Sequence, residues 1–415
     1  MRLSQKRNLA LLIFLNLALI ISAQQRCSFD EQWLQKKQQP SFQSRINTIE
    51  DRIQRQINTQ TNLDVRNSYQ IPVVFHVLWN TEKENLTDEV IATQLDILNQ
   101  DFAGQNSDLS LVPNSFRPLI AAANIEFCMA SMDPSGEPAV GITRTRTFVD
   151  SLSLNQVYYS SGEGQDAWNT QQYLNIWIAN LGNNLVGFGS YPGQNIAAED
   201  GVVIDYRVFG LNNHPRLNLG RTLTHEVGHY LGLFHPWGAG LFNSDCDGDD
   251  QVVDTPIQST TYSGQCPDGL ATIPQSCGSL DMYMNFMNYT NDACLHMFTK
   301  GQQLRMLATL LEMRPSLLNA AACLEVNQPN PQKGVIKIGP NPTSGSLYVS
   351  SFLNESSVVR LEVFNLKGQI IYLSQQDEVE QFFSQAINTT SWSTGTYIIR
   401  VELGNQTLVR KILKY

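Results

Sequence analysis

Runs of apolar residues mark the regular elements in the middle of the chain. Apolar stretches typical of buried strands occur at residues 71–79, 124–129, 174–179 and 202–206. Apolar positions on a helical period predict helices at residues 88–102, 221–233 and 299–318. Strands and helices in alternation favour an α/β layer. The stretch between residues 233 and 298 shows neither period, so we expect it to be irregular.

The segments on either side of this region have different patterns. Residues 24–66 are polar and rich in Gln, and four isoleucines at spacings of three and four (Ile46, Ile49, Ile53 and Ile57) predict one amphipathic helix. Residues 323–335 have the composition of a linker. From residue 336 to 415, short apolar stretches alternate with turn signals. We expect about seven short strands there, which favours a β-sandwich.

The N-terminus is typical of a secretory signal peptide. Arg2, Lys6 and Arg7 precede an apolar run, and small residues follow at Ser22 and Ala23. The run is too short to span a bilayer comfortably, since a spanning helix needs about 20 apolar residues. We therefore predict a signal peptide at residues 1–23, no spanning segment in the mature chain, and an oxidising destination that favours disulfides.

Composition limits the class of protein. The chain has 415 residues, a net charge of −10 and 42% hydrophobic residues. The length predicts two to three domains, and the apolar content is sufficient for a core. The acidic balance argues against a nucleic-acid partner, which would require a basic surface.

Residues 225–235 read HEVGHYLGLFH and carry the clearest chemical signal. His225 and His229 lie four residues apart on a predicted helix, so both imidazoles face one point. Gly232 can end the helix in a left-handed conformation, and His235 can then return to the same point. Three imidazoles leave one position open on a tetrahedral Zn²⁺, which is typical of a catalytic site. Glu226 could accept a proton from the activated water.

Two simpler interpretations of these histidines are less favoured. They could be hydrogen-bonded core residues, but the chain has only 6 histidines and three of them lie here. They could hold structural zinc, but such sites usually have four protein ligands, often thiolates. No cysteine is adjacent to the motif in the sequence.

The extended motif resembles that of the metzincin metalloproteases. Residues 285–289 (NFMNY) resemble the methionine turn of that group, with Met287 beneath the metal. The resemblance implies that Tyr289 stabilises the tetrahedral intermediate. Ordinary packing of Met287 and Tyr289 in a core is the alternative.

Over residues 70–320 the chain resembles the pappalysin group of metzincins. The resemblance rests on residues 254–256 (DTP), 298–306 (FTKGQQLRM) and 200–206, and on the cysteines after the zinc motif. It implies the disulfides Cys246–Cys277 and Cys266–Cys294, which would support an irregular lower half of the catalytic domain. It also implies calcium bound by Asp250, the Val253 carbonyl and Thr255. The alternative for this acidic loop is a solvated surface, and its spacing does not match an EF-hand.

Three further residues are singled out. Relatives use a pro-segment cysteine to occupy the open zinc position, and Cys27 could serve here, although Ser28 follows it instead of the usual glycine. Cys27 could equally be free or paired in a disulfide. Cleavage near Arg66 would remove the pro-segment. The pappalysin resemblance also implies an acidic pocket that favours basic substrate residues, and Asp292 is the candidate for it. The pairing of Cys128 and Cys323 stays open.

The C-terminal region resembles the sorting domain of type IX-secreted bacterial proteins. Residues 338–345 (IGPNPTSG), 363–368 (VFNLKG), 395–397 (GTY) and the basic end at 411–414 carry this resemblance. It implies an interaction with a secretion machinery. A carbohydrate-binding or generic immunoglobulin-like module is the alternative.

The sequence thus predicts an α+β fold. A metzincin-like catalytic domain at residues 67–322, with a mixed twisted sheet and a zinc-binding helix, follows a pro-segment at 24–66 and precedes a small all-β sandwich at 336–415. The predicted function is a secreted zinc endopeptidase, made as a latent precursor and acting on proteins or peptides. A non-catalytic surface or adhesion protein on the same scaffold, or a zinc hydrolase of non-peptide amides, are the alternatives.

Overall fold

The computed structural model describes most of the chain, and the ranges that it covers are 27–59, 69–137, 139–182, 185–238, 246–259, 261–263, 273–319, 323, 336–339, 343, 346–352, 356–379, 382–404 and 406–414. The predicted signal peptide, Arg66, Cys266 and nearly all of the predicted linker lie outside these residues. Within the described residues, no helix combines the length and the apolar character that crossing a membrane requires.

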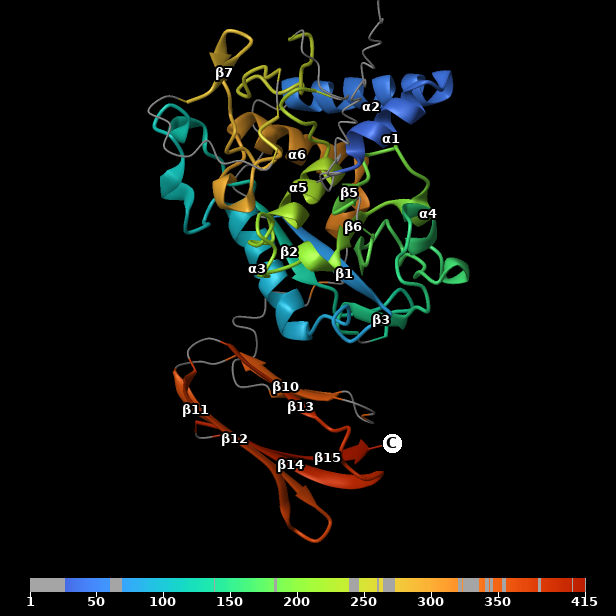
Figure 1. The fold of residues 1–415 in the computed structure, drawn as a ribbon, viewed down its shortest axis with the longest axis vertical. Helices are drawn as coiled ribbons and strands as arrows, with labels where there is room; N and C mark the ends of the chain where they lie inside the picture. Colours follow the sequence, from blue (N-terminus) through green and yellow to red (C-terminus); the bar gives the residue numbers. More distant parts are fainter. Residues whose placement is uncertain are drawn as a thin grey trace, which may run out of the picture.

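A mixed sheet of six strands forms the centre of the N-terminal part (Figure 1). The strands are β1(Tyr69–Trp79), β2(Ile125–Met129), β3(Ile142–Arg146), β4(Leu174–Ala179), β5(Gly187–Gly189) and β6(Val202–Asp205). Their order is β2-β1-β4-β6-β5, and β3 also pairs with β1. All pairs are parallel except β5 with β6, which is antiparallel. The four apolar runs of the sequence are therefore strands, and β3 and β5 join them.

Three long helices pack around this sheet and largely confirm the predicted helical segments. They are α3(Asp88–Ala103), α5(Arg221–Tyr230) and α6(Lys300–Met313), and a shorter α4 spans Leu154–Val157. Apolar side chains of β1 and β4 pack with those of α3, α5 and α6 in one buried cluster. The apolar period at residues 299–318 runs past the end of α6, because a 3-10 turn begins at Pro315. Further 3-10 turns cover 109–111, 117–119, 160–162, 197–199, 206–208 and 292–294.

The N-terminal segment contains two helices, α1(Phe29–Lys37) and α2(Pro40–Thr59). The isoleucine spacing is confirmed in α2, where Ile46, Ile49 and Ile53 are buried. Their neighbours in a shared apolar cluster include Tyr191 and Phe234. In Figure 1 both helices lie over the end of the N-terminal part that holds α5 and α6. Gly193, with φ +72°, leaves space for Ile49, because a Cβ at this position would overlap that side chain.

The segment that follows α5 has little regular structure, as expected. Its described strands are the short pair β7(Gln275–Ser276) and β8(Ser279–Leu280). The predicted Cys246–Cys277 disulfide is present. Cys294 is also disulfide-bonded, and its predicted partner Cys266 lies outside the described residues. A further bridge joins Cys128 to Cys323, which decides the pairing that the sequence left open.

The C-terminal region is an antiparallel β-sandwich, as the alternating pattern predicts. Its strands are β9(Lys337–Gly339), β10(Ser346–Phe352), β11(Ser357–Asn365), β12(Ile370–Val379), β13(Phe382–Asn388), β14(Gly395–Leu403) and β15(Gln406–Lys414). One sheet has the order β13-β10-β9 and the other β12-β11-β14-β15. Their inward side chains, such as Leu347, Leu361 and Ile399, form a separate apolar core.

Candidate metal centre

The end of α5 brings the three histidines together. Gly232 has φ +85°, its N–H donates to the His229 carbonyl, and the Leu233 N–H donates to the Gly228 carbonyl. These two bonds define a Schellman turn, which ends the helix a few residues earlier than predicted and turns the chain back. His235 thereby reaches the imidazoles of His225 and His229, and all three side chains are fully buried.

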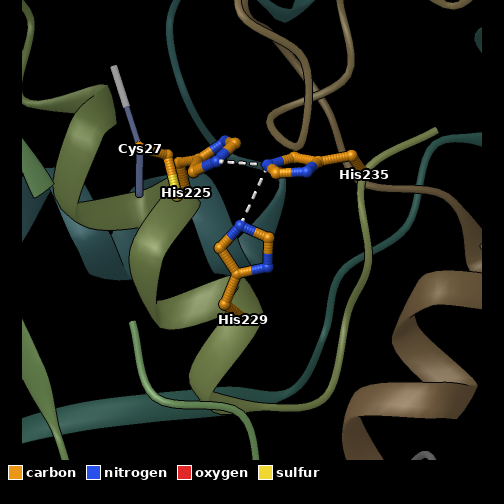
Figure 2. Close-up of side chains that lie close together, drawn as sticks. All are labelled: Cys27, His225, His229 and His235. Atoms are coloured by element: carbon orange, nitrogen blue, oxygen red, sulfur yellow. Dashed lines mark hydrogen bonds between the residues drawn. The ribbon is translucent and has the colours of Figure 1, made fainter. Parts of the chain in front are cut away.

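The spacing of the ring nitrogens fits a tetrahedral metal ion (Figure 2). The Nε2 atoms of His229 and His235 lie 3.1 Å apart, and those of His225 and His235 lie 3.3 Å apart. Nitrogens bound about 2.0–2.1 Å from a tetrahedral zinc would be about 3.3–3.4 Å apart. Burial, and then the charge of His235, hold the pKa of His229 well below its usual range. The neutral form that can bind a metal is therefore favoured.

Each histidine is oriented through its other ring nitrogen. His225 Nδ1 lies 2.8 Å from the Phe286 carbonyl, and His229 Nδ1 lies 2.8 Å from the Leu233 carbonyl. His235 Nδ1 lies 3.0 Å from Oδ1 of Asp30, in the N-terminal segment. An acceptor at Nδ1 fixes the proton there and leaves the Nε2 lone pair available for the metal.

Cys27 lies beside this cluster. Its Sγ and one nitrogen from each of the three histidines lie within 4.8 Å of one another. The thiol donates to Glu226 Oε2 at 3.3 Å, and the Phe29 N–H donates to the sulfur at 3.3 Å. Burial, and then the Glu226 carboxylate, raise the pKa of Cys27. The structure therefore places the predicted latency residue within reach of the position that a metal would occupy.

Glu226 and Tyr289 also face the cluster. Glu226 is fully buried on α5, and β5 approaches it closely: a Cβ on Gly187 would lie 2.7 Å from Oε1 of Glu226. The Tyr289 ring lies 4.8 Å from the His235 ring and 5.6 Å from the His225 ring, between centroids. Burial raises the pKa of Tyr289 well above its usual range, so its hydroxyl stays protonated and can donate.

Met287 packs directly beneath α5. It is fully buried, and a Cβ on Gly228 would overlap its sulfur. The glycine in the middle of the motif therefore allows the methionine turn to approach the helix. Phe286, in the same turn, supplies the carbonyl that orients His225.

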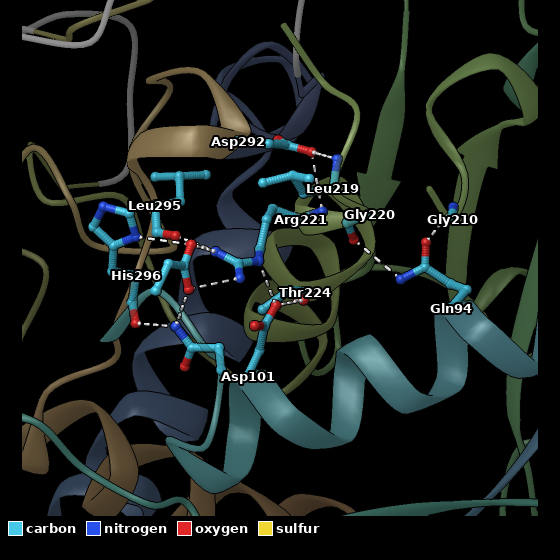
Figure 3. Close-up of polar contacts among 12 residues, drawn as sticks. Gln94, Asp101, Gly210, Leu219, Gly220, Arg221, Thr224, Asp292, Leu295 and His296 are labelled. Atoms are coloured by element: carbon cyan, nitrogen blue, oxygen red, sulfur yellow. Dashed lines mark hydrogen bonds and ion pairs between the residues drawn. The ribbon is translucent and has the colours of Figure 1, made fainter. Parts of the chain in front are cut away.

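A buried ionic network holds the start of α5 (Figure 3). Arg221 Nε lies 3.0 Å from Asp101 Oδ2 on α3, and Arg221 Nη2 lies 3.1 Å from Asp108 Oδ1. Thr224 donates to Asp101 at 2.7 Å. Burial raises the pKa of Asp101 to about 7, although Arg221 opposes the shift. His296 Nδ1 lies 3.1 Å from Asp108.

Asp292 has a structural role that the sequence did not indicate. Its side chain is fully buried, and Oδ2 accepts the backbone N–H groups of Leu219 and Arg221 at 3.0 and 3.2 Å (Figure 3). This carboxylate therefore joins the segment after the methionine turn to the start of α5. The predicted place of Asp292 in a substrate pocket and the preference for basic substrates both stay predictions.

The acidic loop after the zinc motif contains two polar groups that are poorly satisfied. Asp250 Oδ2 and Thr255 Oγ1 are buried and have no hydrogen-bond partner among the described residues. Burial raises the pKa of Asp250 well above its usual range. The Val253 side chain is exposed. A cation held by the predicted oxygens would satisfy both buried groups.

Sequence reasoning missed Asp30, Gly187 and Arg221. Asp30 lies three positions after Cys27, but nothing in a polar, Gln-rich segment distinguishes it from the neighbouring Glu31. Gly187 lies in a strand of 3 residues, which is too short for a periodic signal. Arg221 immediately precedes the helical motif and has the appearance of an ordinary surface cation in the sequence.

The fold and the site together define a metalloprotease precursor with a three-histidine zinc centre. The family model described as pregnancy-associated plasma protein-A, peptidase family M43, matches residues 158–311. A model described as a secretion system C-terminal sorting domain matches residues 337–415. An extracellular metalloprotease of Verticillium alfalfae is 30% identical over 254 residues, which cover 59% of this chain and 76% of that protein.

Solved structures agree with this assignment. A mutant of Tannerella forsythia promirolysin aligns with a TM-score of 0.64 and 36% identity, covering 71% of this chain and 97% of that one. Tannerella forsythia mature mirolysin in complex with a cleaved peptide aligns with a TM-score of 0.57 and 40% identity, covering 61% and 96%. The chain belongs to the M43 pappalysin family of zinc metalloproteases, and it carries a C-terminal type IX secretion sorting domain.

Proposed function

We propose that this extracellular metalloprotease cleaves proteins with Glu226 as general base and Tyr289 as the donor that stabilises the oxyanion. The observation that carries the proposal is the convergence of three Nε2 atoms beside the buried Glu226 carboxylate. Zinc held by His225, His229 and His235 would polarise the scissile carbonyl and lower the pKa of the attacking water. Glu226 accepts the proton of that water and passes it to the leaving amine, and the Tyr289 hydroxyl donates to the developing oxyanion.

Casein cleavage by the processed enzyme tests this assignment. We expect cleavage to stop in a zinc chelator and to return when zinc is restored. Glu226→Ala is expected to reduce kcat/KM by at least about 10²–10⁴-fold, the usual contribution of a general base. Tyr289→Phe is expected to lower kcat with little change in KM, because its contact forms in the transition state. Unchanged cleavage by Glu226→Ala would contradict the proposal.

We also propose that Cys27 keeps the precursor latent by occupying the open metal position. The support is its place within 4.8 Å of the three histidine nitrogens, in a segment that precedes the catalytic domain. Cys27→Ala precursor is expected to cleave a peptide substrate earlier than wild type. Ser28→Ala, a change at the neighbouring buried residue, is the matched control. Equal latency of the Cys27→Ala and Ser28→Ala precursors would reject this role.

A calcium ion bound by Asp250, the Val253 carbonyl and Thr255 is a further proposal. The unsatisfied oxygens of Asp250 and Thr255 support it. Bound calcium would add about 2.7 kcal/mol of stability at 100 times its Kd. A calcium-specific chelator is therefore expected to lower the melting temperature of the zinc-loaded wild type and of Asp249→Asn, but not of Asp250→Asn. An unchanged wild-type melting curve would count against the site.

The proposed organisation is a signal peptide at residues 1–23, a pro-segment at 24–66, a catalytic domain at 67–322, a linker at 323–335 and a sorting domain at 336–415. We propose that a secretion machinery recognises the last of these. Deletion of residues 336–415 is expected to retain the protease inside the outer membrane without loss of proteolysis. Normal release of the truncated protease would contradict the sorting role.

A further inference from the structure

We propose that Asp30 is a positioning residue for the zinc ligand His235, so that the pro-segment strengthens metal binding in the precursor as well as closing the site. The inference rests on the proposed zinc centre and concerns a different atom from the Cys27 sulfur. Removal of the pro-segment would therefore take the Asp30 carboxylate away from the ligand His235 permanently.

The three ligands differ in what orients them. His225 and His229 donate from Nδ1 to the carbonyls of Phe286 and Leu233, which belong to the catalytic domain and stay after cleavage. His235 donates to a carboxylate instead, and this carboxylate belongs to the first turn of α1, in the segment that processing removes. Asp30 is thus the acceptor that the precursor contributes to its own metal centre.

Asp30 is held in place by a second contact. Its Oδ2 accepts the Trp237 Nε1–H at 3.3 Å, while Oδ1 lies 3.0 Å from His235 Nδ1. The Trp237 ring stacks on the His235 ring at 4.6 Å between centroids, with 15° between the planes. Only 4% of the Asp30 residue surface is exposed. The carboxylate is therefore fixed by the indole and the imidazole together, away from bulk water.

A buried carboxylate affects the ligand more strongly than a carbonyl does. Its negative charge favours electron donation from Nε2 and so strengthens the bond from Nε2 to a metal. Phe29, the preceding residue, stacks on His229 at 4.1 Å and 4°, which shields the same side of the cluster. Removal of the pro-segment would replace this environment by a more polar one. The processed enzyme is then expected to bind zinc less tightly and to have a more electrophilic metal centre.

The experiment measures zinc affinity in the full chain carrying Glu226→Gln, which prevents self-cleavage. Competition with a chromophoric chelator gives the zinc Kd, and the melting temperature of the metal-free protein reports folding. Asp30→Ala is expected to weaken zinc binding by about 10- to 100-fold, the usual effect of losing such a partner. Asp30→Asn, which keeps an acceptor but loses the charge, is expected to fall between Asp30→Ala and the parent.

Glu31→Ala is the matched control, because it removes the same charge from an exposed neighbour in the same helical turn. We expect its zinc Kd to equal that of the parent, and we expect Asp30→Asn, which keeps an acceptor for Trp237, to weaken zinc binding at a metal-free melting temperature close to that of Glu31→Ala. Zinc binding by Asp30→Ala as tight as by Glu31→Ala would overturn the inference. The inference would also be overturned if zinc affinity fell only in those variants whose metal-free melting temperature fell as well.

Repeating the comparison with Cys27→Ala separates the two pro-segment contacts. Asp30 touches His235 directly, so the fold-change on Asp30→Ala is expected to persist without the thiol. Its disappearance would show that Asp30 acts only by holding Cys27, and would reject the role proposed here. The latency assay is a separate test. Equal latency of the Cys27→Ala and Ser28→Ala precursors would reject the role of Cys27, but it would not change the zinc Kd measured for Asp30→Ala.

Discussion

The zinc helix α5 and the pro-segment helix α2 are both fixed by an arginine–carboxylate pair, but the two pairs differ in burial. At the start of α5, the Arg221 side chain is 7% exposed and its partner Asp101 is 1% exposed. On α2, Glu50 pairs with the fully buried Arg305 of α6 at 2.7 Å, and the Glu50 side chain is 21% exposed. The catalytic domain therefore supplies both members of the first pair and only the buried cation of the second.

This difference matches the fates of the two helices. α5 must keep the histidines in place throughout the life of the enzyme, and its ion pair is enclosed by α3 and the segment after the methionine turn. In the proposed processing α2 belongs to the segment that is cleaved off, so it must bind firmly and later leave. Its acid reaches Arg305 from the rim, and the apolar contacts of Ile46, Ile49 and Ile53 supply the remaining area. Water can therefore replace Glu50 at its exposed edge once the pro-segment departs.

Arg221→Ala is expected to have the largest effect, because it leaves Asp101 and Asp108 without their cation. Breaking a buried ion pair from one side costs about 3–5 kcal/mol. We expect a loss of this size in the free energy of unfolding by urea, in both precursor and processed enzyme. The charge explanation is checked by combining Arg221→Met with Asp101→Asn. If the combination loses as much as the sum of the single changes, uncompensated charge is not the cause.

Glu50→Ala is expected to have an intermediate effect that is confined to the precursor. It removes one partner of Arg305, at a cost of about 1–3 kcal/mol because Glu50 is partly exposed. Tyr191, which also contacts both groups, retains its bond to Arg305 at 2.8 Å. The precursor is expected to melt at a lower temperature and to lose its pro-segment faster. A Glu50→Ala precursor that melts at the wild-type temperature and keeps its pro-segment as long as wild type would contradict this explanation.

Arg52→Ala is expected to have the smallest effect, and it tests the contrast on the same helix. Arg52 pairs with Glu312 at 3.2 Å, but the two side chains are 45% and 30% exposed. Exposed pairs contribute about 0–1 kcal/mol. The Arg52→Ala precursor is expected to melt at nearly the same temperature as the wild-type precursor. The small remaining difference is expected to disappear in high salt. A loss as large as that of Glu50→Ala would show that burial does not distinguish the contacts of α2.

The sequence predicted those features that short-range periodicity encodes. The apolar runs gave the main strands, the isoleucine spacing predicted α2, and the spacing of His225 and His229 with Gly232 predicted the metal centre. Contacts between distant positions could not be predicted in this way. Asp30 and His235 are 205 residues apart in sequence, and Glu50 and Arg305 are 255 apart. No local pattern shows which acid meets which base.

The structure also corrects two helix boundaries and adds two strands, β3 and β5, to the central sheet. α5 ends at Tyr230 because the Schellman turn at Gly232 stops it, and α6 ends at Met313 before Pro315. β5 pairs with β6 over 3 residues and contains two glycines, because side chains there would collide with Glu226 and the backbone of α5. The position of β5 is determined by the elements that pack around it, and its three residues are too few to show an apolar period.

The Cys128–Cys323 bridge affects how the protease would bear tension. Cys323 is the last described residue before the C-terminal sandwich begins at Ile336, and it also pairs with Ala130 next to β2. A pull applied to the sandwich during export would pass through the sulfur atoms into β2, which is bonded to β1 at the centre of the sheet. α6 and the 3-10 turn after it would lie inside the closed covalent loop and carry little of the load. The last helix of the catalytic domain could thus stay folded while the tail is under force.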